Sequence, residues 1–223
     1  IELAKKYNTR FHILHITTLE EARMFEAGPI KNKRITSEAC AHHLYFSDQD
    51  YITLGNQIKC NPAIKTEADR DAILQAVLDD RIDIIASDHA PHTWEEKGEP
   101  YIKAPSGLPL VQHTLQIMLS HWKEGRISLE RIIEKMCHAP AECFNITGRG
   151  YLEEGYFADI VMLDLERDTK VSKENILYKC GWSPLENQTL PGTISGTWVN
   201  GVRLFDQSGV TGVPAGRRMG FDR

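Results

Sequence analysis

The residues best suited to chemistry lie in the run D-H-A-P-H at residues 88–92. This run directly follows an apolar segment, residues 82–86, that has the composition of a buried strand. Parallel α/β sheets place their functional groups at the carboxyl ends of such strands. Asp88 can ligate a metal ion or accept a proton, and His92 belongs to the loop that follows. The pattern indicates a reactive strand end, although a capping aspartate with two solvated histidines is the simpler alternative.

Two further clusters contain histidines. Residues three apart on a strand face opposite sides, so only one of His12 and His15 can point to the functional end of a sheet. His15 is nearer the end of its strand and is the better candidate for a metal ligand. His42 and His43 follow Glu38 and, as adjacent residues, are expected to face apart. We therefore predict that they do not clamp one ion together and that their role is structural, with at most one hydrogen-bonding near the site.

Two turns add groups that could hold a polar ligand. Asn61 precedes a proline and is held extended, so its amide could offer both a donor and an acceptor. Ser106 and Gly107 lie in the tight turn A-P-S-G. An ordinary turn explains both segments equally well. Imidazole and carboxylate together suit zinc, but His15 and Asp88 are only two ligands and predict part of a metal centre.

Composition excludes several classes of protein. Of the 223 residues 41% are hydrophobic and 26% charged, and the net charge of −5 argues against a nucleic-acid partner. The apolar runs are far shorter than the roughly 20 residues that span a membrane, and no signal peptide is expected. The five cysteines are scattered and odd in number, which favours reduced thiols and a cytoplasmic location. The first residue is Ile1 rather than methionine, so we expect a piece of a longer protein.

The first part of the chain alternates strands and helices. Strands are predicted at residues 10–16, 34–39 and 82–88. A helix over 18–27 begins with the capping-box pattern T-x-x-E, and another helix begins after Thr66. This order predicts βα units with a parallel sheet.

The second part of the chain changes from helical to β-rich sequence. Helices are expected over 110–122, 128–138 and 139–144, whereas glycines beyond Gly148 separate short β-prone runs at 158–163, 193–199 and 202–205. A complete (β/α)8 barrel needs about 250 residues. We therefore expect an α/β fold in which residues 1–148 form the last βα units of a TIM-type barrel. Residues 149–223 would contribute strands of a small β-sandwich domain.

Taken together, the motifs resemble those of the dihydroorotase family of class I type. Dihydroorotases are metal-dependent cyclic amidohydrolases of pyrimidine biosynthesis. The resemblance covers nearly the whole chain and rests on H-I-T-T at 15–18, E-A-C-A-H-H-L at 38–44, N-P-A-I-K at 61–65, S-D-H-A-P-H-T-W-E-E-K at 87–97, A-P-S-G at 104–107 and E-G-Y-F-A-D-I-V-M-L-D at 154–164. The D-H-A-P-H-T-x-E-E-K pattern is specific to this family, whereas H-x-x-T and A-D-I-V are shared more widely. Ala41 and N-P-A-I-K depart from the family's usual proline and N-P-P-L-R, which puts the subfamily in doubt.

The resemblance implies roles for particular residues. His15 is similar to the metal-ligating histidine of the sixth barrel strand, and Asp88 to the aspartate that binds the other metal and transfers the proton. The residues similar to those that hold the substrate are Asn61, His92, Ser106 and Gly107. The implied cofactor is Zn²⁺, binuclear in the complete protein. The family's H-x-H pair, bridging ligand, remaining histidine and substrate-binding arginine are expected upstream of Ile1.

The implied activity is the reversible hydrolysis of dihydroorotate to N-carbamoyl-aspartate. The expected partners are this small-molecule substrate, a second copy of the chain in a homodimer, and aspartate carbamoyltransferase. One alternative is another cyclic amidohydrolase, such as an allantoinase or dihydropyrimidinase. A second alternative is an inactive dihydroorotase-like scaffold for aspartate carbamoyltransferase.

Overall fold

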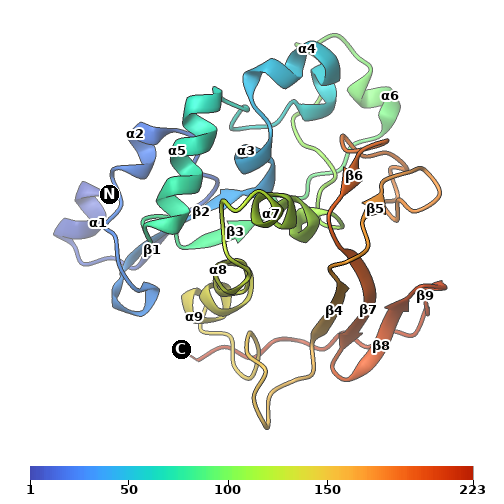
Figure 1. Cartoon of the computed structure of the whole chain (residues 1–223). Helices are drawn as coiled ribbons and strands as arrows, with labels where there is room; N and C mark the ends of the chain where they lie inside the picture. Colours follow the sequence, from blue (N-terminus) through green and yellow to red (C-terminus); the bar gives the residue numbers. More distant parts are fainter. Residues whose placement is uncertain (223) are drawn as a thin grey trace.

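Three parallel strands form the centre of the computed structural model, which describes residues 1–222 (Figure 1). They lie in the order β1-β2-β3 and span Phe11–Ile13, Ile35–Cys40 and Ile84–Ala86. The register pairs Phe11 with Ile35 and Glu38 with Ile84. The carboxyl ends of the three strands therefore point toward the same edge, with β1 ending opposite Ser37 and β3 opposite Cys40. The predicted βα order with a parallel sheet is confirmed.

Short helices connect and flank these strands. The α-helices are α1 (Glu2–Lys6), α2 (Leu19–Ala22), α3 (Ala41–Tyr45), α4 (Tyr51–Leu54), α5 (Glu67–Leu78), α6 (Trp94–Lys97), α7 (Thr114–Lys123), α8 (Leu129–Ile133) and α9 (Ala139–Cys143). Single turns of other helix types are η1 (Ile30–Asn32), η2 (Asp48–Asp50), η3 (Gly55–Ile58) and the π-helical η4 (Glu134–His138). Over the described residues, no helix is both long and apolar enough to cross a membrane.

Helix α2 is shorter than the sequence predicts. Thr18 caps it as expected. The Thr18 hydroxyl accepts a hydrogen bond from the Glu21 amide, and the Glu21 carboxylate accepts one from the Thr18 amide. The helix nevertheless ends at Ala22 instead of near residue 27. Phe25 turns into the core, where it is 4% exposed, and its carbonyl accepts a hydrogen bond from Arg81. Tertiary packing thus overrides local helix propensity here.

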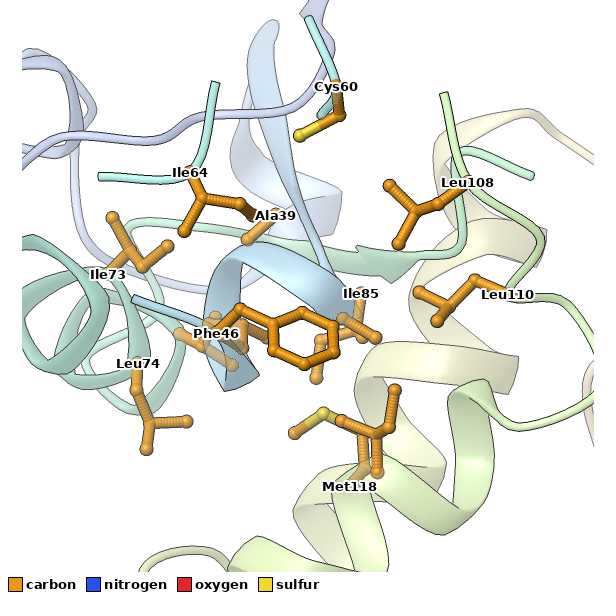
Figure 2. Close-up of a cluster of buried hydrophobic side chains, with 14 of the residues drawn as sticks. Ala39, Phe46, Cys60, Ile64, Ile73, Leu74, Ile85, Leu108, Leu110 and Met118 are labelled. Carbon is orange, nitrogen blue, oxygen red and sulfur yellow. The ribbon is translucent and has the colours of Figure 1, made fainter. Parts of the chain in front are cut away.

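One hydrophobic core lies between the sheet and its helices (Figure 2). Helix α5 begins at the predicted cap, Thr66, and buries a single face toward the sheet. The side chains drawn in Figure 2 come from β2, β3, α5, α7 and the segments between them, and include Ala39, Phe46, Ile64, Ile73, Leu74, Ile85, Leu108, Leu110 and Met118. Burying one such isoleucine or leucine contributes about 1.5–3 kcal/mol. This packing fixes the strand ends on which the site is built.

The C-terminal part of the chain contains two antiparallel sheets. One has the order β4-β7-β8-β9, and the other pairs β5 with β6. Their bounds are Ile160–Asp164, Thr193–Val199, Val202–Asp206 and Gly209–Val210 for the first sheet, and Thr169–Lys170 and Thr189–Leu190 for the second. The predicted β-rich character is confirmed, whereas the domain boundary at residue 148 stays a prediction.

Helix α7 joins the two parts of the chain (Figure 1). Gln116 donates a side-chain hydrogen bond of 2.9 Å to the carbonyl of Gly192. A Cβ atom at Gly192, where φ is +76°, would lie 2.8 Å from Leu119 Cδ1, so only glycine allows this approach. At the start of α7, buried His113 lies 3.1 Å (Nδ1) from the Tyr178 hydroxyl. Burial lowers the pKa of His113 to about 4.

The low pKa of His113 predicts a loss of stability in mild acid. Because this pKa lies below the unfolded value of 6.5, the unfolded chain binds more protons between pH 6.5 and 4, and the free energy of unfolding falls as the pH falls. His113→Asn keeps an acceptor for Tyr178 but cannot titrate. The free energy of unfolding, measured with urea, should fall less steeply with pH for the variant than for the parent over this interval. The two slopes should differ by up to about 1.4 kcal/mol per pH unit. Equal slopes for the variant and the parent would contradict the assignment.

Candidate functional site

The two predicted metal ligands follow the carboxyl ends of the two outer strands of the sheet. His15 is two residues beyond the end of β1, and Asp88 is two residues beyond the end of β3. Both have left-handed backbone conformations, with φ of +40° for His15 and +43° for Asp88. Such conformations are uncommon for residues other than glycine and cluster at functional sites. The turn at His15 also explains why β1 ends at Ile13 rather than at the predicted residue 16.

The charges of His15 and Glu38 both act on Asp88. Burial raises the pKa of Asp88, the negative charge of Glu38 raises it further, and the imidazole of His15 opposes both effects. A carboxylate with a raised pKa is a better proton acceptor than an ordinary aspartate. The geometry therefore allows Asp88 to exchange protons with a bound ligand.

Glu38 also binds His12, a contact that the sequence did not predict. His12 Nδ1 lies 2.8 Å from the Thr36 hydroxyl, and Nε2 lies 3.1 Å from Glu38 Oε2. Although burial alone lowers the pKa of His12, its contacts with Cys143 and Glu38 raise the pKa to about 9. The strand alternation expected between His12 and His15 does not apply, because His15 lies beyond the strand. His12 thus orients Glu38, whose charge acts on Asp88.

The structure brings three of the four predicted substrate-binding residues into contact. His92 Nε2 lies 3.1 Å from the carbonyl oxygen of Ser106. A Cβ atom at Gly107, where φ is +132°, would lie 2.5 Å from the Ala90 carbonyl oxygen and 3.2 Å from His92 Nε2. Only glycine lets this turn approach the loop after β3 so closely. Asn61 is exposed and makes no such contact within the described residues. Its segment is nevertheless tied to the turn, because the Gly107 amide donates a hydrogen bond of 2.9 Å to the carbonyl of Lys59, two residues before Asn61.

Lys97 holds these loops together and was missed by the sequence analysis. It is 3% exposed, and its ammonium donates to the carbonyls of Lys59, Pro105 and Gly107 at 2.8–3.0 Å. Burial lowers the pKa of Lys97 to about 8. Its place at the end of the T-W-E-E-K motif was the available signal, because Thr93 and Glu96 form a capping box that directs this short helix.

His89, the other histidine of the D-H-A-P-H run, has a structural role. Its Nδ1 accepts a hydrogen bond of 3.0 Å from the Leu110 amide. Its ring lies 5.3 Å from the ring of Tyr178. Burial lowers the pKa of His89, which keeps Nδ1 available as an acceptor. These contacts direct the chain from the loop after β3 toward α7.

The expectation that His42 and His43 face apart is wrong. They lie on α3 rather than on a strand, and successive residues of a helix diverge by only about 100°. Their ring centroids are 4.1 Å apart, and both side chains are buried. One ring nitrogen from each lies within 4.8 Å of the other and of Cys40 Sγ.

Comparison with known proteins places this geometry in a family. The model of the amidohydrolase family matches residues 1–204. The chain belongs to the amidohydrolase family. A dihydroorotase of Bacillus pumilus is 33% identical over 206 residues, covering 92% of this chain and 48% of that protein. A dihydroorotase of Bacillus subtilis is 34% identical over the same shares of each chain. The predicted resemblance is confirmed, and this amidohydrolase chain spans about half the length of the curated relatives it matches.

Solved structures of other amidohydrolases share the fold. The L-hydantoinase (dihydropyrimidinase) of Arthrobacter aurescens superposes with a TM-score of 0.82 at 26% identity, covering 94% of this chain and 48% of that one. A D-hydantoinase from Thermus sp. superposes with a TM-score of 0.84 at 16% identity, covering 95% of this chain and 48% of that one. At this identity the match shows a shared fold and nothing further. The predicted fold class, part of a barrel followed by a β region, is confirmed.

The contacts of Lys97 predict that this amidohydrolase chain depends on it for stability. Lys97→Met leaves three buried carbonyls without their shared donor, which should lower the free energy of unfolding by roughly 3 kcal/mol. Faster proteolysis within residues 98–107 should accompany the loss. Lys103→Met, at an exposed lysine of the same loop, is the control and should change stability by less than about 0.5 kcal/mol. Similar unfolding curves for the two variants would refute the role of Lys97.

Proposed function

We propose that the chain contributes proton transfer and substrate binding to a dihydroorotase, which interconverts dihydroorotate and N-carbamoyl-aspartate. The observation that carries this proposal is that His15 and Asp88, both in left-handed conformations, follow the carboxyl ends of the two strands that flank β2. The confirmed family and the dihydroorotase relatives support it further.

The donor set fits a divalent metal ion. His15 offers an imidazole and Asp88 a carboxylate at the same edge of the sheet, and both are ligands that zinc accepts. We propose Zn²⁺, with His15 and Asp88 contributing part of a binuclear centre in the complete protein. A bound metal would supply Lewis-acid polarisation of the amide carbonyl and lower the pKa of water.

Asp88 is the proposed proton-transfer group. Its carboxylate would accept a proton as water attacks the ring amide and then deliver that proton to the departing ring nitrogen. Burial and the charge of Glu38 raise the pKa of Asp88, whereas the imidazole of His15 and a bound metal ion would lower it. The contact between His12 and Glu38 keeps the second carboxylate oriented.

The loop after β3 and the A-P-S-G turn are the proposed substrate-holding elements. When His92 is cationic, its Nε2–H can remain on the Ser106 carbonyl, and Nδ1–H, now 3.8 Å from Glu96 Oε2, would donate to the substrate carboxylate in place of Glu96. The Gly107 amide is already bonded to Lys59, so Gly107 contributes by permitting close approach. Asn61 and the Ser106 hydroxyl would provide polar contacts to the ring.

Activity on another cyclic amide is the second candidate function. The structural match to the Arthrobacter L-hydantoinase favours it, since that enzyme shares both fold and half of its length with this chain. Dihydroorotate differs from dihydrouracil by a carboxylate, and from hydantoin by ring size as well as the carboxylate, for which His92 is the proposed partner. An inactive scaffold is the remaining alternative, and the pairing of His15 with Asp88 disfavours it. A homodimer, association with aspartate carbamoyltransferase and a cytoplasmic location follow from the resemblance and belong to the same proposal.

Asp88→Ala tests the proton-transfer role. In the protein that carries this chain, loss of general acid–base catalysis should lower kcat for dihydroorotate by at least about 100-fold. His89→Asn is the matched control, because the asparagine oxygen can still accept from the Leu110 amide, and its kcat should stay near that of the parent. A kcat of Asp88→Ala comparable to that of the control would contradict the proposal.

Substrate choice tests the role of His92. The protein should turn over dihydroorotate far faster than hydantoin, allantoin or dihydrouracil. His92→Asn should raise KM for dihydroorotate by about 10-fold or more, the expected loss of a charge-assisted hydrogen bond, with a smaller effect on uncharged cyclic amides. A preference for an uncharged substrate would instead establish the second candidate function.

A further inference from the structure

A second group of metal-ligating side chains lies where β2 meets α3. Cys40 is the last residue of β2, and His42 and His43 lie in the first turn of α3. Cys40 Sγ and one ring nitrogen of each histidine all lie within 4.8 Å of one another. The three side chains are buried, with relative exposures of 0% for Cys40 and His42 and 3% for His43. Such a compact group of sulfur and nitrogen donors is unusual inside a hydrophobic core.

His42 provides an independent observation that something binds here. Within residues 1–222, neither ring nitrogen of His42 makes a hydrogen bond of acceptable geometry, although the backbone of Ser87 is close enough to one of them to act on the pKa of the ring. A buried polar group without a partner costs about 1–3 kcal/mol, so it normally marks a bound water, an ion or another ligand. Burial and the adjacent His43 and His15 imidazoles lower the pKa of His42, so its imidazole is neutral and carries the lone pair that a metal requires.

The hydrogen bond of His43 identifies the nitrogen that is free to bind a metal ion. His43 Nε2 lies 2.9 Å from the carbonyl oxygen of Pro62, and a carbonyl accepts only from N–H. Nε2 therefore carries the proton, which leaves Nδ1 as an unprotonated, buried nitrogen without a partner among the described residues. Metal-bound histidines commonly donate their other N–H to a backbone carbonyl in this way.

Cys60 is close to His43 but lies on the other side of its ring. Its Sγ is 3.8 Å from Nε2, the nitrogen that is already engaged, and its thiol donates to the Pro62 carbonyl. Cys60 thus shares the surroundings of the cluster without facing His43 Nδ1. It is the matched control for any experiment on Cys40.

We propose that Cys40, His42 and His43 form a buried binding site for a thiophilic divalent cation of the zinc class. One sulfur and two nitrogen ligands suit Zn²⁺ and exclude Mg²⁺ and Ca²⁺, which prefer oxygen. The three ligands leave one coordination position for water or another small donor. Binding would deprotonate the Cys40 thiol and release a proton to solvent. The site uses neither His15 nor Asp88 as a ligand and does not depend on the proposed function.

Cobalt substitution tests this site directly. The full chain is freed of metal, reduced and titrated with Co²⁺, a spectroscopic substitute for zinc. Thiolate coordination should produce an intense sulfur-to-cobalt charge-transfer band in the near ultraviolet, with about one equivalent bound. Neither His15 nor Asp88 has sulfur, so this band distinguishes a cysteine-containing site from the proposed catalytic centre, and the variants below assign it among the five free cysteines.

Variants assign the ligands. Cys40→Ser should abolish the band, and His42→Gln should weaken Co²⁺ binding by at least about 10-fold, as expected for loss of a ligand in a structured site. Cys60→Ser keeps a hydroxyl for the Pro62 carbonyl and should retain the band, as should Asp88→Ala. Absence of the band in the parent chain would overturn the proposal even if a variant failed to fold. Persistence in Cys40→Ser, or loss in Cys60→Ser, would overturn the ligand assignment.

Discussion

The parallel pairing of β1, β2 and β3 is the constraint on which the rest of the structure depends. Parallel strands in register end at one edge of the sheet, so residues that are distant in sequence meet there. His15 and Asp88 come from the two outer strands and Glu38 from the central one. The core formed by α5, α7 and the sheet keeps these ends fixed (Figure 2). The site is therefore a consequence of strand register, with loops adding ligand-binding groups.

Crowding of ionisable groups at this edge follows from the same pairing. Burial raises the pKa of Asp88, and the charge of Glu38 adds to the rise because β2 lies between the strands that carry the two ligands. The contact with His12 directs Glu38, and the loop beyond Asp88 is fixed by the buried ammonium of Lys97. One short sheet and one lysine thus position both the proposed proton-transfer group and the loop that we propose holds the substrate.

Much of the fold was predictable because it depends on local sequence. The caps at Thr18 and Thr66 were visible as side-chain oxygens followed by helical periodicity, and β7 has the predicted bounds of 193–199. The end of α2 was not predictable, because Phe25 leaves the helix for contacts with residues far along the chain. His15 and Asp88 were identified from residue type and position after apolar runs. Their placement together required the strand register, which the sequence does not state.

The errors at the site have two physical causes. His42 and His43 were expected to face apart as adjacent residues, although β2 ends at Cys40 and a helix begins at once. That single change of backbone conformation turns two side chains expected to diverge into neighbours with ring centroids 4.1 Å apart. Lys97 was overlooked because its partners are backbone carbonyls, which carry no residue signature. Sequence patterns thus locate reactive side chains well, whereas the transition from strand to helix decides which of them can act on the same ion.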